Sequence, residues 1–153
     1  MIPEIRQNLE PTYPNLVDHP TVQTRTPVPG LDTSLFFFSH SATETTDDQM
    51  SKCNEPEAEM IVHFFCYLVH NGVTPERITV LTYYNGQRKL IDRTLRKTGI
   101  ALNSRVTVVT VDSYQGEEND IVLLSLVRSN VSVVACHSQP CYDAGGCPSS
   151  RQT

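Results

Sequence analysis

The sequence predicts an α/β domain built on a mostly parallel sheet, and two observations lead to this prediction. Two runs rich in Val, Leu and Ile, Val106–Val111 and Ile121–Val127, flank the polar loop Asp112–Asp120. Such runs are typical of strands buried on both faces, as in a parallel sheet covered by helices. Upstream of them, apolar runs alternate with stretches of helical periodicity, which is the element order of α/β folds.

The N-terminal third of the chain carries weaker signals. In Met1–Glu10 the apolar residues fall at helical spacing, so a short helix is expected. Pro11–Gly30 contains five prolines and is expected to be an extended loop. Leu35–Phe38 is a compact apolar run and is the expected first strand. Ser39–Lys52 is polar and acidic and is the expected mobile loop.

A helix is predicted from about Pro56 to His70. Asn54 can cap its first turn, because an Asn side chain accepts a hydrogen bond from a free backbone N–H. The pair Asn71 and Gly72 can end it, because either residue accepts a left-handed backbone. The stripe expected to be buried consists of Ala58, Ile61, Val62, Phe65, Leu68 and Val69.

The second strand is predicted at Ile78–Tyr83 and is followed by a helix over roughly Gly86–Thr98, which Gly99 ends. The residues expected to face inward are Leu90, Ile91 and Leu95, and the outward bases are Arg88, Lys89, Arg93, Arg96 and Lys97. The two apolar runs described first supply the last strands. The loop between them is shorter than the dozen or so residues of a normal parallel crossover. Either it contains a tight helical turn leading to a non-adjacent strand, or the last two strands are arranged differently.

The composition fits one globular domain, because 39% of the 153 residues are hydrophobic and 19% are charged. A net charge of −5 argues against a free-standing nucleic-acid binder, since such binding relies on neutralising phosphates. Acids gather between Glu44 and Glu59, and bases between Arg88 and Arg105. No apolar run reaches the ~20 residues that span a bilayer, and no secretion leader opens the chain. With five Cys, an odd number, we expect an intracellular protein, cytoplasmic or nuclear, without a membrane partner.

Motifs of self-contained catalytic centres are absent from the sequence. It holds no GxxxxGK phosphate loop, no GxSxG elbow and no HExxH zinc motif. The tail, residues 131–153, offers four potential metal ligands, which are Cys136, His137, Cys141 and Cys147. Their spacing lacks the tight pair of a structural zinc site. An irregular tail without a metal is therefore the favoured interpretation.

Two polar segments at strand ends could contact a ligand. Gln115–Glu118, QGEE, follows the strand at 106–111, and α/β proteins place ligand sites in such loops. Tyr83–Lys89, YYNGQRK, follows the preceding strand and opens the basic helix, where free N–H groups could bind an anion. The alternative for each segment is purely structural: a solvated turn with a glycine for geometry, or an Asn-Gly turn with a helix cap. The local pattern alone favours these structural alternatives.

Several motifs together resemble a known family. Thr110–Asn130, TVDSYQGEENDIVLLSLVRSN, closely resembles motif V and its extension in superfamily 1B helicases of the nonsense-mediated-decay type. Ile78–Gln87, ITVLTYYNGQ, resembles their motif IV, and the initial MIPEI resembles the second half of their QxRMhPEI motif. Asp18–Val22, DHPTV, and the Leu31–Phe38 run resemble the NFX-type zinc-finger-containing helicases in particular. The similarity spans about Met1–Asn130.

The resemblance implies an incomplete RecA-like fold of the P-loop NTPase type over residues 1–130, with the tail outside it. The chain would be the second RecA-like domain of an ATP-dependent RNA or DNA helicase. In that family, ATP with Mg lies between two RecA-like domains, and single-stranded RNA or DNA runs across both. By resemblance, Glu117 would bond the ATP ribose and Gly116 would line the nucleotide cleft. Gln115 would lie between nucleotide and nucleic acid.

The same resemblance assigns five residues to the single strand. Thr110 and Ser113 would touch the nucleic-acid backbone. The motif IV surface facing the strand would include Thr82, Tyr83 and Gln87.

Two departures from the family pattern limit the expected activity. The first RecA-like domain, with its phosphate loop, is absent, and no motif VI supplies an arginine finger after Asn130. Loss of such a finger costs about 10³–10⁵ in rate. We therefore expect no catalytic residue in this chain, no activity of the chain alone, and a truncated product or a foreign tail. The alternatives are a module that binds a full-length helicase or a nucleic acid through the basic helix, and an inactive product.

Overall fold

The computed structural model describes residues 26–100 and 105–129, and in addition Thr12, Asn15, Val17 and Pro20. The helix predicted for residues 1–10 and the tail cysteines lie outside the described residues, so these predictions stay open.

A parallel sheet forms the centre of the described structure. β3 (Ile78–Thr82), which follows the 3₁₀ turn η2 (Pro75–Arg77), lies between β4 (Thr107–Thr110) and β5 (Ile121–Ser125). Both neighbours run parallel to it, and Thr82 is level with Thr110 on one side and with Ser125 on the other. The carboxyl ends of the strands therefore meet at one edge of the sheet, which we call the rim. The predicted parallel sheet is confirmed.

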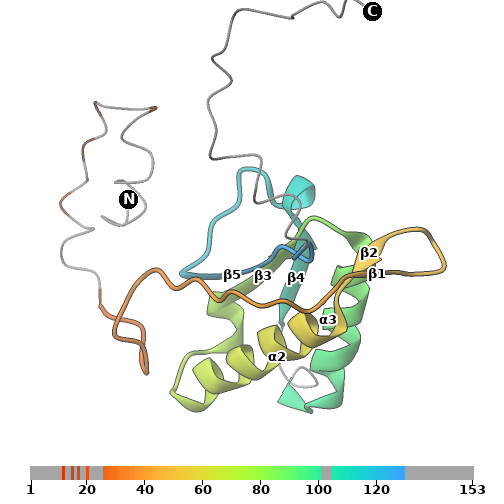
Figure 1. The fold of residues 1–153 in the computed structure, drawn as a ribbon. Coiled ribbons are helices and arrows are strands. Elements are labelled where there is room, and N and C mark those ends of the chain that lie inside the picture. Colours follow the sequence, from red (N-terminus) through yellow and green to blue (C-terminus); the bar gives the residue numbers. More distant parts are fainter. Residues whose placement is uncertain are drawn as a thin grey trace, which may run out of the picture.

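The helices α2 (Glu55–His70) and α3 (Asn85–Lys97) cover one face of this sheet (Figure 1). α2 contacts β5, and α3 contacts β3 and β4. Apolar residues at helical spacing on both helices meet the apolar residues of β3 in one core. Its fully buried members are Ala58, Phe65, Leu68, Ile78, Val80 and Ile91.

Both ends of α2 follow the signals in the sequence. The Asn54 side chain accepts a hydrogen bond from the backbone N–H of Glu57 at 3.1 Å, which caps the first turn. At the other end Gly72 has a φ of 95°, a left-handed conformation that glycine adopts without strain. α2 begins one residue before the predicted start, and α3 begins and ends one residue before the predicted bounds, which is the usual uncertainty of a helix end.

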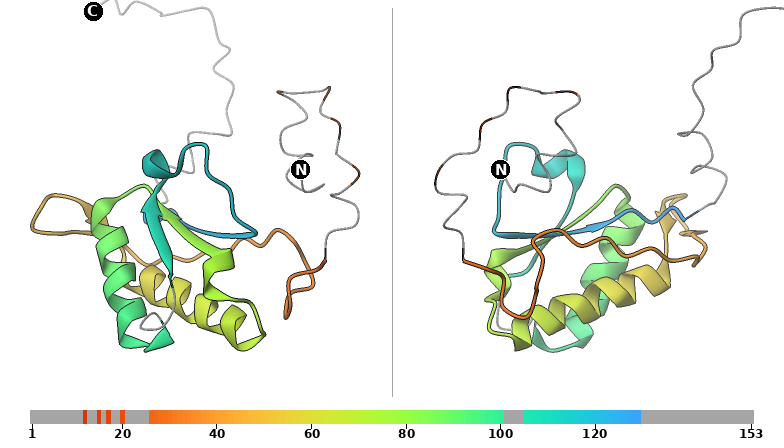
Figure 2. Two further views of the ribbon diagram at one scale, coloured as in Figure 1. Left: turned by 180° about the vertical axis from the view of Figure 1, so that it is seen from behind. Right: turned by 60° about the vertical axis from the view of Figure 1, so that its left-hand side comes forward.

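The connection from β4 to β5 begins with the 3₁₀ turn η4 (Val111–Tyr114) and returns on the side of the sheet opposite the helices (Figure 2). It leads to a strand that pairs with β3 and not with β4. Of the two arrangements that the short loop left open, the first is therefore the correct one: a tight helical turn leads to a non-adjacent strand.

One face of β5 is open to solvent. Leu123 and Ser125 point toward the helices and are 7% and 0% exposed, whereas Val122 and Leu124 are 46% and 47% exposed. Among the described elements, helices lie on one side of the sheet only. The prediction that the last two strands are buried on both faces is therefore wrong for β5.

One prediction for the segment before α2 is also wrong. Residues 35–38 form no strand, and Phe37 is 75% exposed, because the run lies at the surface without a ladder partner among the described strands. Within residues 39–52, which we predict to be a mobile loop, β1 (Thr45–Thr46) pairs with β2 (Lys52–Cys53) in a short antiparallel hairpin. The Asp47 side chain closes this hairpin by accepting hydrogen bonds from the backbone N–H groups of Gln49 and Ser51.

Candidate functional site at the rim of the sheet

The parallel register brings the two candidate segments to the same rim. Because Thr82 and Thr110 are level, Tyr83 and η4 follow neighbouring strands at the same edge of the sheet. The Tyr83 side chain is 57% exposed there. This is the edge at which ligand sites of open α/β sheets are found.

The residues Thr110 and Ser113 form a small exposed hydroxyl pair on η4. Their hydroxyl oxygens lie 3.0 Å apart, and the Ser113 hydroxyl also donates to the Thr110 carbonyl at 2.9 Å. The pair closes the 3₁₀ turn on itself, as Ser and Thr side chains commonly do at turns. Both hydroxyls remain at the surface, where a phosphate oxygen could accept from them.

A tight turn carries Gln115 and Gly116 past the end of η4. The Glu117 N–H donates to the Tyr114 carbonyl at 3.1 Å, which closes a four-residue turn. Gln115 has φ −63° and ψ 123°, and Gly116 has φ 85°. These angles define a type II turn, whose third position requires a left-handed residue. The glycine of the QGE segment is therefore explained by backbone geometry as well as by any ligand.

Further along, the loop is tied to β3 through the buried Thr79 side chain. The Asn119 side chain donates to the Thr79 hydroxyl at 2.9 Å and to the Glu76 carbonyl at 3.0 Å. The Tyr114 hydroxyl lies 3.4 Å from the same Thr79 hydroxyl. These bonds hold the loop on both sides of the turn, so the QGE segment has a defined position although its side chains are exposed.

The exposed turn fits one part of a nucleotide. Around Gly116, a Cβ would meet nothing within 4 Å, so the backbone is open to close approach. The Glu117 carboxylate is exposed and makes no hydrogen bond or ion pair within the described part of the chain. A free carboxylate can accept hydrogen bonds from two neighbouring ribose hydroxyls. The chain's own residues thus fit a ribose, whereas a phosphate loop is absent from the sequence.

Two of the residues assigned to the single strand are buried. Thr82 and Gln87 are both 0% exposed. The Thr82 hydroxyl accepts from the Tyr84 N–H at 3.4 Å, and the Gln87 amide is consumed by bonds inside the protein. The prediction that these two side chains face a nucleic acid is therefore wrong. Tyr83, Thr110 and Ser113 keep positions at which such contact is possible.

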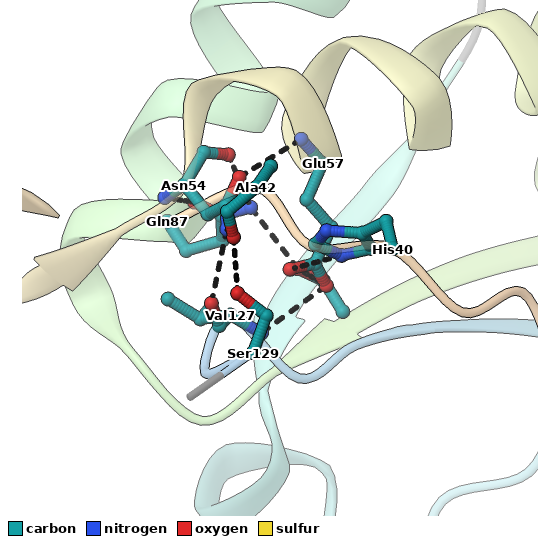
Figure 3. Close-up of polar contacts among 8 residues, drawn as sticks. His40, Ala42, Asn54, Glu57, Gln87, Val127 and Ser129 are labelled. Atoms are coloured by element: carbon teal, nitrogen blue, oxygen red, sulfur yellow. Dashed lines mark hydrogen bonds and ion pairs between the residues drawn. The ribbon is translucent and has the colours of Figure 1, made fainter. Parts of the chain in front are cut away.

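Gln87 belongs to a polar cluster, formed by the side chains of Asn54, Glu57, Gln87 and Ser125. Figure 3 labels Asn54, Glu57 and Gln87 of this cluster. The Gln87 amide oxygen accepts a hydrogen bond from the Asn54 N–H at 2.8 Å. The Gln87 amide nitrogen donates to the Asn54 carbonyl at 3.2 Å and to the Ser125 hydroxyl at 3.0 Å. The Ser125 hydroxyl in turn donates to Glu57 at 2.9 Å. The cluster joins the first turns of both helices to the end of β5.

The polar cluster also holds the chain where it leaves β5. Val127 has a φ of 70°, which is strained for a β-branched residue. Its N–H donates to Glu57 at 3.1 Å, and its carbonyl accepts from the Asn54 side chain at 3.1 Å. His40 adds an ion pair, with its Nε2 3.3 Å from the other Glu57 oxygen. Both backbone groups of Val127 are thus satisfied in the strained conformation.

Sequence reasoning found only the helix cap of this cluster. The spacing of Asn54 and Glu57 is that of a capping box, in which the acid would reach back to the cap. Here Glu57 turns to β5 instead. The sequence did offer one signal, because the acid Glu57 lies on the apolar stripe of α2. No local pattern points to Ser125 or His40 as members of the cluster.

Two further properties concern the described residues as a whole. None of the helices there is long and apolar enough to cross a membrane. No group of three His, Cys, Asp or Glu side chains in that part of the chain comes together as a possible metal site.

Comparisons with known proteins agree with this architecture. Residues 3–144 match the AAA_12 family, described as an AAA domain. The helicase required for RNAi-mediated heterochromatin assembly 1 of Schizosaccharomyces pombe is 44% identical over 131 residues, which cover 85% of this chain and 13% of that protein. NFX1-type zinc finger-containing protein 1 of Mus musculus is 40% identical over 136 residues, 85% of this chain and 7% of that protein.

A third relative, regulator of nonsense transcripts 1 of Dictyostelium discoideum, is 33% identical over 112 residues, 71% of this chain and 8% of that protein. The chain therefore spans 13% or less of the length of these three relatives. The matches and the parallel sheet define a helicase-type domain of the P-loop NTPase class, in superfamily 1. The chain belongs to the AAA_12 family. The resemblance to nonsense-mediated-decay and NFX-type helicases is thereby confirmed.

Proposed function

We propose that residues 1–130 serve as the second RecA-like domain of an ATP-dependent RNA or DNA helicase, with residues 131–153 outside it. The chain supplies half of a nucleotide cleft and part of a single-strand surface. A first RecA-like domain, the partner that the function requires, supplies the phosphate loop and the Mg²⁺ site. The observation that carries the proposal is the exposed type II turn at the rim, with its uncommitted Glu117 carboxylate beside an unobstructed glycine.

In this proposal the rim contacts ATP through its sugar. Glu117 accepts hydrogen bonds from the ribose hydroxyls, Gly116 allows the backbone to approach, and Gln115 lies between nucleotide and single strand. Because ATP is bound from two domains, its γ-phosphate sets their relative position, as in other nucleotide switches. This chain alone holds neither the phosphates nor the metal, so we expect it to hydrolyse no ATP. Turnover by the purified chain that Glu117→Ala abolishes would overturn the proposal.

The single-strand surface consists of the exposed residues at the same rim. The Tyr83 ring offers a stacking platform for a base, and such stacking is worth about 1–3 kcal/mol. The hydroxyls of Thr110 and Ser113 can donate to backbone phosphates. Thr82 and Gln87 are excluded from this surface because they are buried.

A chimera tests the nucleotide role. In the S. pombe relative, the 131-residue segment that matches this chain is replaced by the corresponding residues of this chain, which restores a first domain. We expect nucleic-acid-stimulated ATP hydrolysis by the chimera, and a KM for ATP at least about tenfold higher in Glu117→Ala, because a lost charged hydrogen bond costs about 1.5–3 kcal/mol.

The neighbouring acid provides the matched control. Glu118 is exposed like Glu117 and carries the same charge, so Glu118→Ala changes the net charge and the electrostatic field of the rim to the same extent. We expect the KM of Glu118→Ala to stay within about twofold of the parent chimera. Equal effects of both substitutions would mean that net charge matters and that the ribose contact does not exist.

A second candidate function is a nucleic-acid-binding module built on α3. Arg93 and Lys97 are exposed and have no partner among the residues that the structure describes, although the chain carries a net charge of −5. Arg96 differs, because its hydrogen bond to Asp92 raises the pKa of Arg96 and engages its charge. A gel shift at low salt with Arg93→Gln/Lys97→Gln decides this candidate. No shift with the parent chain removes it.

A further inference from the structure

The loop between β4 and β5 is fixed to the sheet by a buried hydroxyl, that of Thr79. Thr79 is the second residue of β3 and is 1% exposed. Its neighbours along the strand, Ile78 and Val80, belong to the core under the helices. Because side chains alternate along a strand, Thr79 points to the other face of the sheet, where the loop crosses (Figure 2). A hydroxyl buried there is costly unless it is hydrogen-bonded.

Within the described part of the chain, the hydrogen bonds of the Thr79 hydroxyl go to the loop. The hydroxyl accepts from the Asn119 side chain at 2.9 Å, and it lies 3.4 Å from the Tyr114 hydroxyl. A hydroxyl has one hydrogen to donate and two lone pairs that accept, so it can make both bonds at once. Thr79 therefore joins two points of the loop to one point of the sheet.

These two points enclose the exposed turn. The Tyr114 carbonyl accepts from the Glu117 N–H at 3.1 Å, so Tyr114 is the first residue of the type II turn. Asn119 follows shortly after Glu117 in the sequence. The backbone that carries Glu117 is thus held on both sides, while the Glu117 side chain itself is exposed.

The Asn119 side chain is committed inside the protein. Besides its bond to Thr79, its amide nitrogen donates to the Glu76 carbonyl at 3.0 Å. Its amide oxygen accepts from the Asp120 N–H at 2.8 Å. Asn119 can therefore act on a ligand only through the position of the loop.

We infer that Thr79 is a positioning residue for the ribose contact of Glu117, acting through Tyr114 and Asn119. The inference rests on the proposed nucleotide role of the rim. A carboxylate accepts from two ribose hydroxyls only where its oxygens lie within hydrogen-bond distance of both, so the backbone that carries it must keep its position. The Thr79 hydroxyl supplies this constraint from under the loop, without touching the nucleotide.

The ratio of two KM values in the chimera described above tests the inference. The KM for 2′,3′-dideoxy-ATP, which lacks both ribose hydroxyls, is divided by the KM for ATP. We expect a ratio of at least about tenfold in the parent chimera, because a lost hydrogen bond to a charged group weakens binding by that much. Glu117→Ala should abolish the difference between the two nucleotides, because the group that distinguishes them is gone.

Thr79→Val keeps the shape and the strand propensity of the side chain but removes the hydroxyl. We expect the ratio to fall to about threefold or less, because a small displacement of the carboxylate weakens its contact strongly. Thr79→Ser keeps the hydroxyl and should keep the parental ratio. Thr94→Val is the matched control, because it removes a threonine hydroxyl that donates to the Leu90 carbonyl at 2.9 Å on α3. It should also keep the parental ratio.

A loss of stability by itself does not change this ratio. A smaller folded fraction lowers the apparent kcat for both nucleotides and leaves both KM values as they were. If the Thr79→Val chimera hydrolyses no ATP, Tyr114→Phe decides in the same way, because it removes the other hydroxyl of the 3.4 Å contact. A reduced ratio then supports the inference, and the parental ratio overturns it.

Failure of the inference and failure of the proposed function give different results. If Glu117→Ala abolishes the difference between the nucleotides but Thr79→Val keeps the full parental ratio, the inference is wrong and the proposed function stands. If the parent chimera does not distinguish the two nucleotides, the ribose contact does not exist, and the inference falls with it.

Discussion

Two glutamines follow neighbouring strands of the same sheet, but one side chain is buried and the other is exposed. Gln87 lies in the first turn of the helix after β3, where it is fully buried and makes three hydrogen bonds. Gln115 lies in the turn after β4, where its side chain is exposed. The Gln87 side chain links parts of the protein to one another, whereas the Gln115 side chain makes no hydrogen bond among the described residues.

The difference shows that one rim of the sheet holds both a buried, hydrogen-bonded cluster and an exposed turn whose side chains are free to bind. The polar cluster around Gln87 satisfies buried backbone groups at the start of α2 and just after β5, so it is costly to disturb. The turn around Gln115 is held from below by Asn119 and Tyr114, so its own side chains are free. Substitutions in the two turns should therefore separate stability from binding.

The largest effect on stability is expected from Gln87→Ala. It leaves the buried Asn54 N–H without a partner and removes the donor to the Ser125 hydroxyl, and an unsatisfied buried group costs about 1–3 kcal/mol. We expect the free energy of unfolding to fall by about 3 kcal/mol in urea titrations followed by circular dichroism. A loss below about 1 kcal/mol would mean that the polar cluster does not stabilise the fold.

Glu57→Gln should have the next largest effect. The substitution keeps the shape and one acceptor oxygen for Ser125 and Val127, but it removes the negative charge that strengthens these bonds. We expect a loss of about 1.5 kcal/mol in the same titration. His40→Ala in the Glu57→Gln background should then cost less than in the wild type, since the ion pair is already gone.

Gly116→Ala tests the backbone of the exposed turn. A residue with a Cβ at a φ of 85° is strained, and the strain costs about 1–2 kcal/mol. We expect a loss of about 1 kcal/mol, because the turn can relax at the surface where nothing lies within 4 Å of the new methyl group. Asn at the same position tolerates the left-handed region better, so Gly116→Asn should lose less than Gly116→Ala.

The smallest effect is expected from Gln115→Ala, the matched control for Gln87→Ala. An exposed side chain away from special backbone geometry changes stability by no more than about 0.5 kcal/mol. In the chimera, the same substitution should weaken the coupling between nucleic-acid binding and ATP hydrolysis. A stability loss as large as that of Gln87→Ala would show that the two turns do not differ in the way described.

The local elements of the fold were predictable because their signals lie within a few residues of one another. The stripe of α2, the Asn54 cap and the parallel strands all follow from periodicity and from capping chemistry. The error at residues 35–38 has a physical reason: a strand needs a partner as well as a composition, and the run contributes only the composition. The open face of β5 was missed because a strand is buried on both faces only where elements cover both sides of the sheet. An apolar run does not reveal whether a second covering layer is present.

At the rim, the sequence alone established which residue types stand at strand ends, including the glycine that a type II turn demands. Which of these residues face solvent depended on contacts between distant segments. Gln87 meets a partner 33 residues away, and Glu57 meets partners 68 and 70 residues away. Such pairs are set by how the helices pack on the sheet, and no window of neighbouring residues contains that information.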